Sequence, residues 1–196
     1  MKIRKGWMIS LTACLLLGLW LWRYISLNDY YKKISDQTRC IYPVGEIVPF
    51  GEDYIDKDLC VNGYALRVEK FEIVDGKSYI DSLEEKFYGS RPDKIALVYI
   101  TLFNENSDAP GVMLTTLRLY GVDQYASMNW NLLDAINPVL KGNQGIRLSV
   151  GTEYSLVLPY NLLRNEYGTS TWKNINDYAF FLRITNFPTE KDIKVQ

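Results

Sequence analysis

The chain contains no histidine among its 196 residues. Histidine is the only side chain whose unperturbed pKa lies near neutrality, so its absence excludes Ser-His-Asp and Cys-His catalytic arrangements. Most zinc sites are excluded as well, because they use histidine ligands. Catalysis would have to rely on carboxylates, lysine or tyrosine, and we expect neither an enzyme nor a bound cofactor or metal.

The chain also lacks an excess of positive charge. It has 22 Lys and Arg against 23 Asp and Glu, which gives a formal net charge of -1. Nucleic-acid-binding proteins neutralise phosphates with a basic excess, so a DNA or RNA partner is excluded. Tyrosine is abundant, with 15 residues, and valine, isoleucine and threonine occur in short alternating stretches. This composition favours a β protein.

The N-terminal segment has the features of a membrane anchor. Three cations lie within residues 1–5, and residues 6–27 form an apolar segment. A hydrocarbon core needs about 20 helical residues, and basic residues before the span place the N-terminus in the cytoplasm. We therefore predict a cytoplasmic tail at 1–5, a transmembrane anchor at 6–27, a juxtamembrane stalk at 28–39 and an extracytoplasmic domain at 40–196. The predicted localisation is the cell membrane, with a single pass.

Two other interpretations of this segment stay open. A cleavable signal peptide would end in a small-x-small exit, whereas the apolar run here ends at Leu21-Trp22-Arg23. The sequence LTAC at 11–14 fits the lipobox pattern, in which Cys14 is lipidated, although the apolar run continues beyond Cys14. We expect an uncleaved anchor, with lipidation of Cys14 as the alternative.

Cysteine is scarce, with three residues in the chain. Cys14 lies in the anchor, so Cys40 and Cys60 are the two thiols of the exported part. In an oxidising compartment this pair favours a disulfide, and closing a loop of about 20 residues is worth roughly 3 kcal/mol in the chain-entropy model. Two separate buried thiols are the alternative.

From Cys40 onward the chain consists of short alternating runs between turn residues. Residues 64–75 alternate with a slip near Lys70 that predicts a β-bulge, and the dipeptides Asn62-Gly63 and Asp75-Gly76 at the ends of this run predict hairpin turns. Residues 94–103 are apolar on both faces, which predicts a central strand covered on two sides. Residues 80–88 are charged and could form a short helix or a mobile loop, and residues 129–137 carry apolar residues without a firm period. The regular spacing of strands predicts an all-β sandwich. The expected strands are 64–75, 94–103, 112–120, 145–150, 152–158, 179–185 and 192–195.

Four short motifs carry a family resemblance. They are YPVGEIVPFG at 42–51, NGY at 62–64, LPY at 158–160 and ITNFPT at 184–189. With these motifs the chain resembles a domain-of-unknown-function family, fifty twenty-eight, of Gram-positive surface proteins. That family is similar to the immunoglobulin-like sandwiches of secreted immunoprotective antigens. The resemblance implies an immunoglobulin-like β-sandwich at the cell surface, and it supplies no catalytic residues.

Two segments are similar to ligand-binding loops but lack the residues that such loops require. Acidic residues gather at 52–58, and hard cations prefer several carboxylates in one loop, but the glycine and terminal glutamate of a calcium loop are missing. We interpret this segment as a solvated acidic loop. Gly76-Lys77-Ser78 is similar to the end of a phosphate-binding loop, but the required first glycine would fall at Phe71, and we interpret it as a hairpin turn.

The remaining candidates are carboxylates and aromatic rings. Glycosidases use paired carboxylates, and the glutamates near aromatics or loops are Glu84, Glu85, Glu153 and Glu166, with no spacing that pairs them. Trp130 and Trp172, with Tyr125 and Tyr178 nearby in sequence, could form an exposed platform for a glycan or peptide. Core packing of these rings is the alternative, because large rings supply much of the buried area of a sandwich.

An anchor, a sandwich and no catalytic constellation favour a non-enzymatic module. We expect it to bind or scaffold a protein partner at the outer face of the membrane. A cell-wall glycan or peptide binder that uses exposed aromatics is the first alternative, and a carboxylate-based hydrolase is the second.

Overall fold

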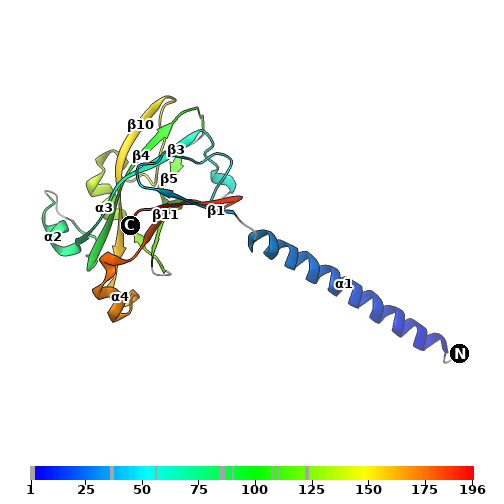
Figure 1. Ribbon diagram of the computed structural model, residues 1–196. Coiled ribbons are helices and arrows are strands. Elements are labelled where there is room, and N and C mark those ends of the chain that lie inside the picture. Colours follow the sequence, from blue (N-terminus) through cyan, green and yellow to red (C-terminus); the bar gives the residue numbers. More distant parts are fainter. Residues whose placement is uncertain are drawn as a thin grey trace. The chain divides into compact units, whose positions relative to one another are not determined.

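The computed structural model describes residues 3–35, 38–55, 57–83, 87–89, 91–106, 108–109, 111–121 and 124–196 (Figure 1). The chain divides into two units, Met1–Gln37 and Thr38–Gln196. The first unit is one helix, and the second consists mostly of strands in several sheets.

The first unit contains helix α1, Ile3–Ser35. Its window Ser10–Leu27 has a mean hydropathy of 1.4 and is long and apolar enough to cross a membrane, a property that anchors and signal sequences share. Helix α1 runs eight residues beyond this window, through most of the predicted stalk, and strand β1 begins at Thr38 rather than at Cys40.

Long and short strands, joined by short helices, make up the second unit. The strands are β1 Thr38–Pro43, β2 Val48–Pro49, β3 Tyr64–Asp75, β4 Lys94–Asn104, β5 Val112–Met113, β6 Arg118–Gly121, β7 Gln124–Tyr125, β8 Ser127–Met128, β9 Gly145–Ile146, β10 Thr152–Leu162, β11 Phe180–Thr185 and β12 Thr189–Lys194. The helices are α2 Gly76–Asp81, α3 Trp130–Ile136 and α4 Thr169–Lys173, and the 3-10 turns are η1 Lys57–Leu59, η2 Leu114–Thr116, η3 Pro138–Leu140, η4 Arg164–Glu166 and η5 Ile175–Asp177.

Two five-stranded sheets dominate this unit. Sheet A has the order β1-β12-β11-β6-β7, and sheet B has the order β2-β3-β4-β10-β8. Strands β3, β4 and β10 lie side by side in Figure 1 and pair antiparallel, whereas β1 pairs parallel with β12. The bulge predicted near Lys70 is confirmed, because the β3–β4 register shifts between Val68 and Lys70.

Both sheets contribute to one hydrophobic core. Leu66, Val98 and Leu158 of sheet B belong to the same buried cluster as Leu182 and Ile193 of sheet A. Strand β4 is apolar on both faces, as predicted, because Ile95 and Leu97 pack on the opposite side of sheet B, in a smaller cluster with Ile80 and Leu132 from helices. In sheet A, successive side chains of β11 and β12 point to opposite faces, so every second side chain points away from the main core.

A helical segment covers the edge of β10, where the sequence predicted no firm period. Asn129 caps α3, its side-chain oxygen accepting from the Leu132 amide at 3.1 Å. The Asn137 side chain then replaces a neighbouring strand: its Nδ2 donates to the Val157 carbonyl at 2.8 Å, and its Oδ1 accepts from the Val157 amide at 2.9 Å. A buried amide thus satisfies backbone groups that the short β8 does not reach.

Three local predictions were wrong. Asp75-Gly76 is not a hairpin turn, because Asp75 caps α2 by accepting from the Ser78 amide at 2.8 Å. Residues 112–120 are not one strand, since η2 separates β5, which pairs with β9, from β6, which pairs with β11. In the region predicted at 145–150, only Gly145–Ile146 is a strand.

Candidate functional site

The face of sheet A that points away from the core carries a group of charged and aromatic side chains, which we call the Arg–Tyr face. It is built from alternate positions of neighbouring strands, opposite to the inward side chains Leu119, Leu182 and Ile193. Its members are Arg39 on β1, Glu190, Asp192 and Lys194 on β12, Phe181 and Arg183 on β11, Arg118 and Tyr120 on β6, and Tyr125 on β7.

A buried carboxylate lies at the centre of the Arg–Tyr face. The Asp192 side chain is 0% exposed. Its Oδ2 accepts from Arg39 Nε at 2.8 Å and from the Tyr120 hydroxyl at 2.5 Å, and its Oδ1 accepts from Arg183 Nε at 3.0 Å. One carboxylate therefore holds three side chains that come from three strands.

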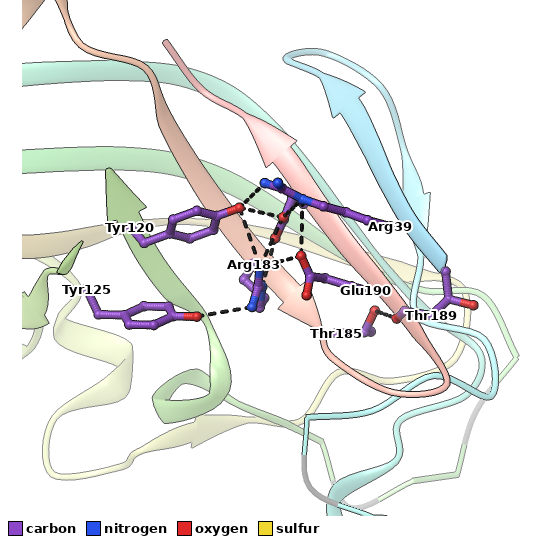
Figure 2. A network of polar contacts seen from close by, with 8 residues as sticks. Arg39, Tyr120, Tyr125, Arg183, Thr185, Thr189 and Glu190 are labelled. Carbon is purple, nitrogen blue, oxygen red and sulfur yellow. Dashed lines mark hydrogen bonds and ion pairs between the residues drawn. The ribbon is translucent and has the colours of Figure 1, made fainter. Parts of the chain in front are cut away.

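Glu190 and Tyr125 extend this network to either side (Figure 2). Glu190 accepts from Arg183 Nη2 and pairs with Arg39 Nε at 3.1 Å. Arg183 Nη1 donates to the Tyr125 hydroxyl at 3.0 Å. The network thus runs from the β1 edge of sheet A to the short strand β7 at the other edge.

Ring contacts hold the same side chains flat on the sheet. The Tyr120 ring stacks on Phe181 with centroids 5.4 Å apart and lies 5.5 Å from the Tyr125 ring. The guanidinium carbon of Arg183 lies 4.9 Å from the Tyr120 centroid, and that of Arg39 lies 5.3 Å from the Phe181 centroid. Cation–π contacts of this kind add to the ion pairs and restrict the rotamers of the arginines.

The network shifts the pKa of its members in opposite directions. Burial opposes ionisation of Asp192, but hydrogen bonds from Arg183, Tyr120 and Arg39 outweigh it and hold the pKa of this carboxyl below its ordinary value. Burial and the nearby charge of Asp192 raise the pKa of Glu190 despite Arg183 and Arg39. Burial and the hydrogen bond to Asp192 raise the pKa of Tyr120 to about 12. At neutral pH Asp192 is therefore a carboxylate that accepts from Arg39, Arg183 and the neutral Tyr120 phenol.

Cations outnumber carboxylates on the described part of this face. Arg118 lies opposite Arg183 in the β6–β11 register, is exposed, and has its guanidinium carbon 6.0 Å from the Tyr125 centroid. Lys194 is also exposed. Tyr125 is 52% exposed. Such a surface can bind an anionic or hydrogen-bonding partner.

The two tryptophans predicted as a platform lie on different helices. Trp130 begins α3, and Trp172 lies in α4 with its ring centroid 5.9 Å from that of Tyr167. Both rings are partly buried and pack against the main core, as does Tyr178. Tyr125, which was grouped with them, belongs to the Arg–Tyr face instead.

The predicted acidic loop is not a solvated one throughout. Asp53 is buried and pairs with Lys191, whose ammonium also donates to the carbonyls of Pro49 and Phe50 at 2.8 and 3.0 Å. The other oxygen of Asp53 accepts from the Thr189 amide at 2.9 Å. The sequence could not show this pair, because Asp53 and Lys191 lie far apart along the chain. Within the described ranges, no group of three acidic or cysteine side chains could hold a metal ion.

The remaining sequence candidates fall in several places. Asp56, Glu84 and Glu85 lie outside the described residues, and Glu153 and Glu166 are exposed on β10 and η4. Cys14 lies in α1, and Cys40 and Cys60 are free thiols in the structure. The bridge between Cys40 and Cys60 in an oxidising compartment stays a prediction.

Comparison with known protein families decides what kind of domain this is. A family model described as a domain of unknown function, DUF5028, matches residues 39–191. The chain belongs to the DUF5028 family. No curated protein and no solved structure matches it. The DUF5028 match includes Arg39, Tyr120 and Arg183 and ends one residue before Asp192, so the family domain contains most of the Arg–Tyr face.

Sequence reasoning did not find the Arg–Tyr face of this DUF5028 domain. A signal was present: Arg118 and Tyr120, Phe181 and Arg183, and Glu190 and Asp192 are each two residues apart, and the first two pairs lie inside predicted strands. Residues spaced by two share one face of a strand. What the sequence could not provide was the strand order that brings the three pairs together.

Proposed function

We propose that this DUF5028 protein is a single-pass membrane protein of the cell envelope whose domain binds another protein through the Arg–Tyr face. Its N-terminus lies in the cytoplasm and the domain lies on the outer side of the membrane. The apolar window Ser10–Leu27, preceded by the cations of residues 1–5, supports this topology.

The observation that carries the proposed binding role is the buried Asp192 beneath a partly exposed set of arginines and tyrosines, in which Arg39, Arg118 and Tyr125 are the exposed members. A carboxylate without solvent contact is costly to bury, so its presence under a sheet surface favours a role in holding Arg39, Arg183 and Tyr120 in fixed positions. Arginine and tyrosine, with tryptophan, are the residues enriched at protein-binding hot spots, and fixed rotamers reduce the entropy lost on binding.

The proposed fold is an immunoglobulin-like sandwich on the surface of a Gram-positive cell. The order β6-β11-β12 corresponds to the C-F-G order of such sandwiches, and the two sheets share one core. In sheet B the order β3-β4-β10-β8 corresponds to the A-B-E-D order of that fold, and β2 is an additional edge strand beside β3. We propose a non-enzymatic role, since the described residues of the Arg–Tyr face offer arginines and tyrosine hydroxyls for recognition and no group placed as a nucleophile.

Photo-crosslinking in intact cells tests the binding role. A photoreactive residue replacing Tyr125 in the full-length protein should give a defined protein adduct, and the same residue at Val150, which is 53% exposed outside the Arg–Tyr face, should not. The adduct should weaken when Asp192→Asn is added, because the arginines lose their fixed positions. Equal crosslinking at both positions, or none at Tyr125, would overturn the proposed role.

Topology is tested by protease treatment of protoplasts. External protease should digest residues 40 onward in the intact cells. If this region is protected until the cells are lysed, the proposed topology is wrong.

A further inference from the structure

Strand β1 lies at the edge of sheet A. Its neighbour in the sheet is β12, and within the part of the chain that the structure describes no strand pairs with its other side. An edge strand presents a row of backbone N–H and C=O groups that can pair with another extended chain. The β1 edge therefore has the geometry that accepts an added strand.

The β1 edge is only partly protected. Natural sheets blunt their edges with charges, proline, bulges or a covering segment. Here Pro43 closes the end of the strand and Arg39 is the charged residue of the strand, but Ile41 in the middle is 53% exposed. Val44 and Ile47, which follow the strand, are 39% and 44% exposed. In strand addition the open edge supplies main-chain hydrogen bonds, and exposed side chains such as Ile41 contact alternate side chains of the added strand.

The charge of Arg39 specifies what the added strand would carry. The Arg39 side chain is 43% exposed, and Arg39 and Ile41 lie two residues apart on the same side of the sheet. A strand that pairs with β1 places one of its side chains beside Arg39 and another, two positions away, beside Ile41. Because cations outnumber carboxylates on this face, the complementary residues are an acidic one beside Arg39 and an apolar one beside Ile41.

A second copy of β1 does not meet this requirement. Residues 38–43 contain no acidic side chain, so no register between two β1 strands places a carboxylate beside Arg39. A partner segment with an acidic residue and an apolar residue two positions apart satisfies both.

We propose that the β1 edge binds an extended segment of a partner protein, in which an acidic residue pairs with Arg39 and an apolar residue two positions away packs on Ile41. This segment extends sheet A by one strand and lies against the Arg–Tyr face. The inference rests on the proposed function, because it identifies how the protein partner engages the domain.

Synthetic peptides test the chemistry of the edge. The probes are fluorescent peptides of about nine residues in which glutamate alternates with valine. Two peptides are controls: one in which lysine replaces glutamate, and one of the same composition in which the glutamates and the valines are grouped into two separate runs. Anisotropy is measured with the full-length protein in detergent micelles. The alternating Glu-Val peptide should bind at least about tenfold more tightly than both controls. Equal binding of the three peptides, or no binding of the alternating Glu-Val peptide, overturns the proposal.

Matched variants and backbone-blocked peptides separate strand addition from general charge attraction. Ile41→Lys should weaken binding of the Glu-Val peptide about tenfold, whereas Val150→Lys, at an equally exposed site elsewhere, should not. Alternate residues of a strand direct their amides to opposite sides. N-methylation of every second residue should therefore abolish binding when the methylated amides are those that face β1, and should leave binding unchanged when they are the other set. Equal effects of the two methylated sets, or of the two lysine variants, count against the proposal.

Crosslinking at two positions keeps this inference distinct from the proposed function. If a photoreactive residue captures a protein at position 125 but never at position 41, the Arg–Tyr face binds a partner and the edge does not. If neither position captures a protein, the proposed function itself fails.

Discussion

Arg183 and Asp192 lie directly opposite each other on the antiparallel strands β11 and β12 and form a two-point ion pair. Arg183 Nε lies 3.0 Å from Oδ1, and Nη2 lies 3.2 Å from Oδ2. Two parallel hydrogen bonds fix the plane of the guanidinium, which then covers the Tyr120 ring. This pair is the support on which the rest of the Arg–Tyr face is arranged.

Removing the charge of Asp192 should destabilise the domain strongly. Asp192→Asn leaves Arg183 and Arg39 without their shared carboxylate, and breaking a buried pair on one side typically costs about 3–5 kcal/mol. The free energy of unfolding is measured by urea titration of the full-length protein in micelles, followed by aromatic fluorescence. Glu153→Gln, at an exposed position on β10, is the control and should change stability little. A loss no larger than that of the control would contradict the support role of Asp192.

The stability of the domain should depend on pH through two opposed groups. The pKa of Asp192 is lowered on folding, so its contribution is present above its ordinary value of 3.8 and is lost as the pH falls through the lower folded value. The pKa of Glu190 is raised, so stability falls as the pH rises from 4.5 through its folded value. The urea midpoint is measured between about pH 3 and 7. Its decrease as the pH rises above 4.5 should be absent in Glu190→Gln, and its decrease as the pH falls below 3.8 should be absent in Asp192→Asn. Unchanged slopes in both variants would refute these assignments.

Local pattern was enough to predict much of the fold. The apolar helix, the bulge near Lys70 and the two-sided burial of β4 follow from residues close together in sequence. The Arg–Tyr face and the Lys191–Asp53 pair depend on which strands become neighbours, and periodicity carries no information on strand order. The end of β3 was misread for a related reason, since a dipeptide that favours a turn also starts a helix when Asp75 can cap it.

The buried Lys191 should contribute strongly to the stability of the domain, unlike the exposed Lys194 on the same strand. Lys191→Met leaves Asp53 and two backbone carbonyls without their donor, so we expect a loss of about 3–5 kcal/mol in the free energy of unfolding. Lys194→Met makes the same change at an exposed position of β12 and should cost less than about 0.5 kcal/mol. Similar unfolding curves for the two variants would show that the Lys191–Asp53 pair does not stabilise the domain.

Asn137 should act as a substitute for backbone pairing. Asn137→Leu has a similar volume but leaves the Val157 amide and carbonyl unsatisfied, which should cost about 2–4 kcal/mol. Asn165→Leu, at an exposed position of η4, is the matched control. Hydrogen exchange should also accelerate at Val157 in the Asn137 variant alone. Unchanged protection at Val157 would mean that the side chain is dispensable.

The predicted disulfide can be judged from where the structure places its two thiols. Cys40 is the register partner of Lys191, whose ammonium binds the Phe50 carbonyl, and Cys60 Sγ lies 3.9 Å from the carbonyl oxygen of Gly51, the next residue. Both thiols therefore belong to the corner where β12 meets the 49–53 segment.

If the domain is exposed to an oxidising compartment, we expect these two thiols to form a bridge across that corner. Alkylation of the denatured, unreduced chain should then label Cys14 alone, and reduction should add two labels. Cys40→Ser and Cys60→Ser should each lower the urea midpoint to the same extent as the double variant, because either change removes the same bridge. Three labels without reduction would show that the bridge does not form.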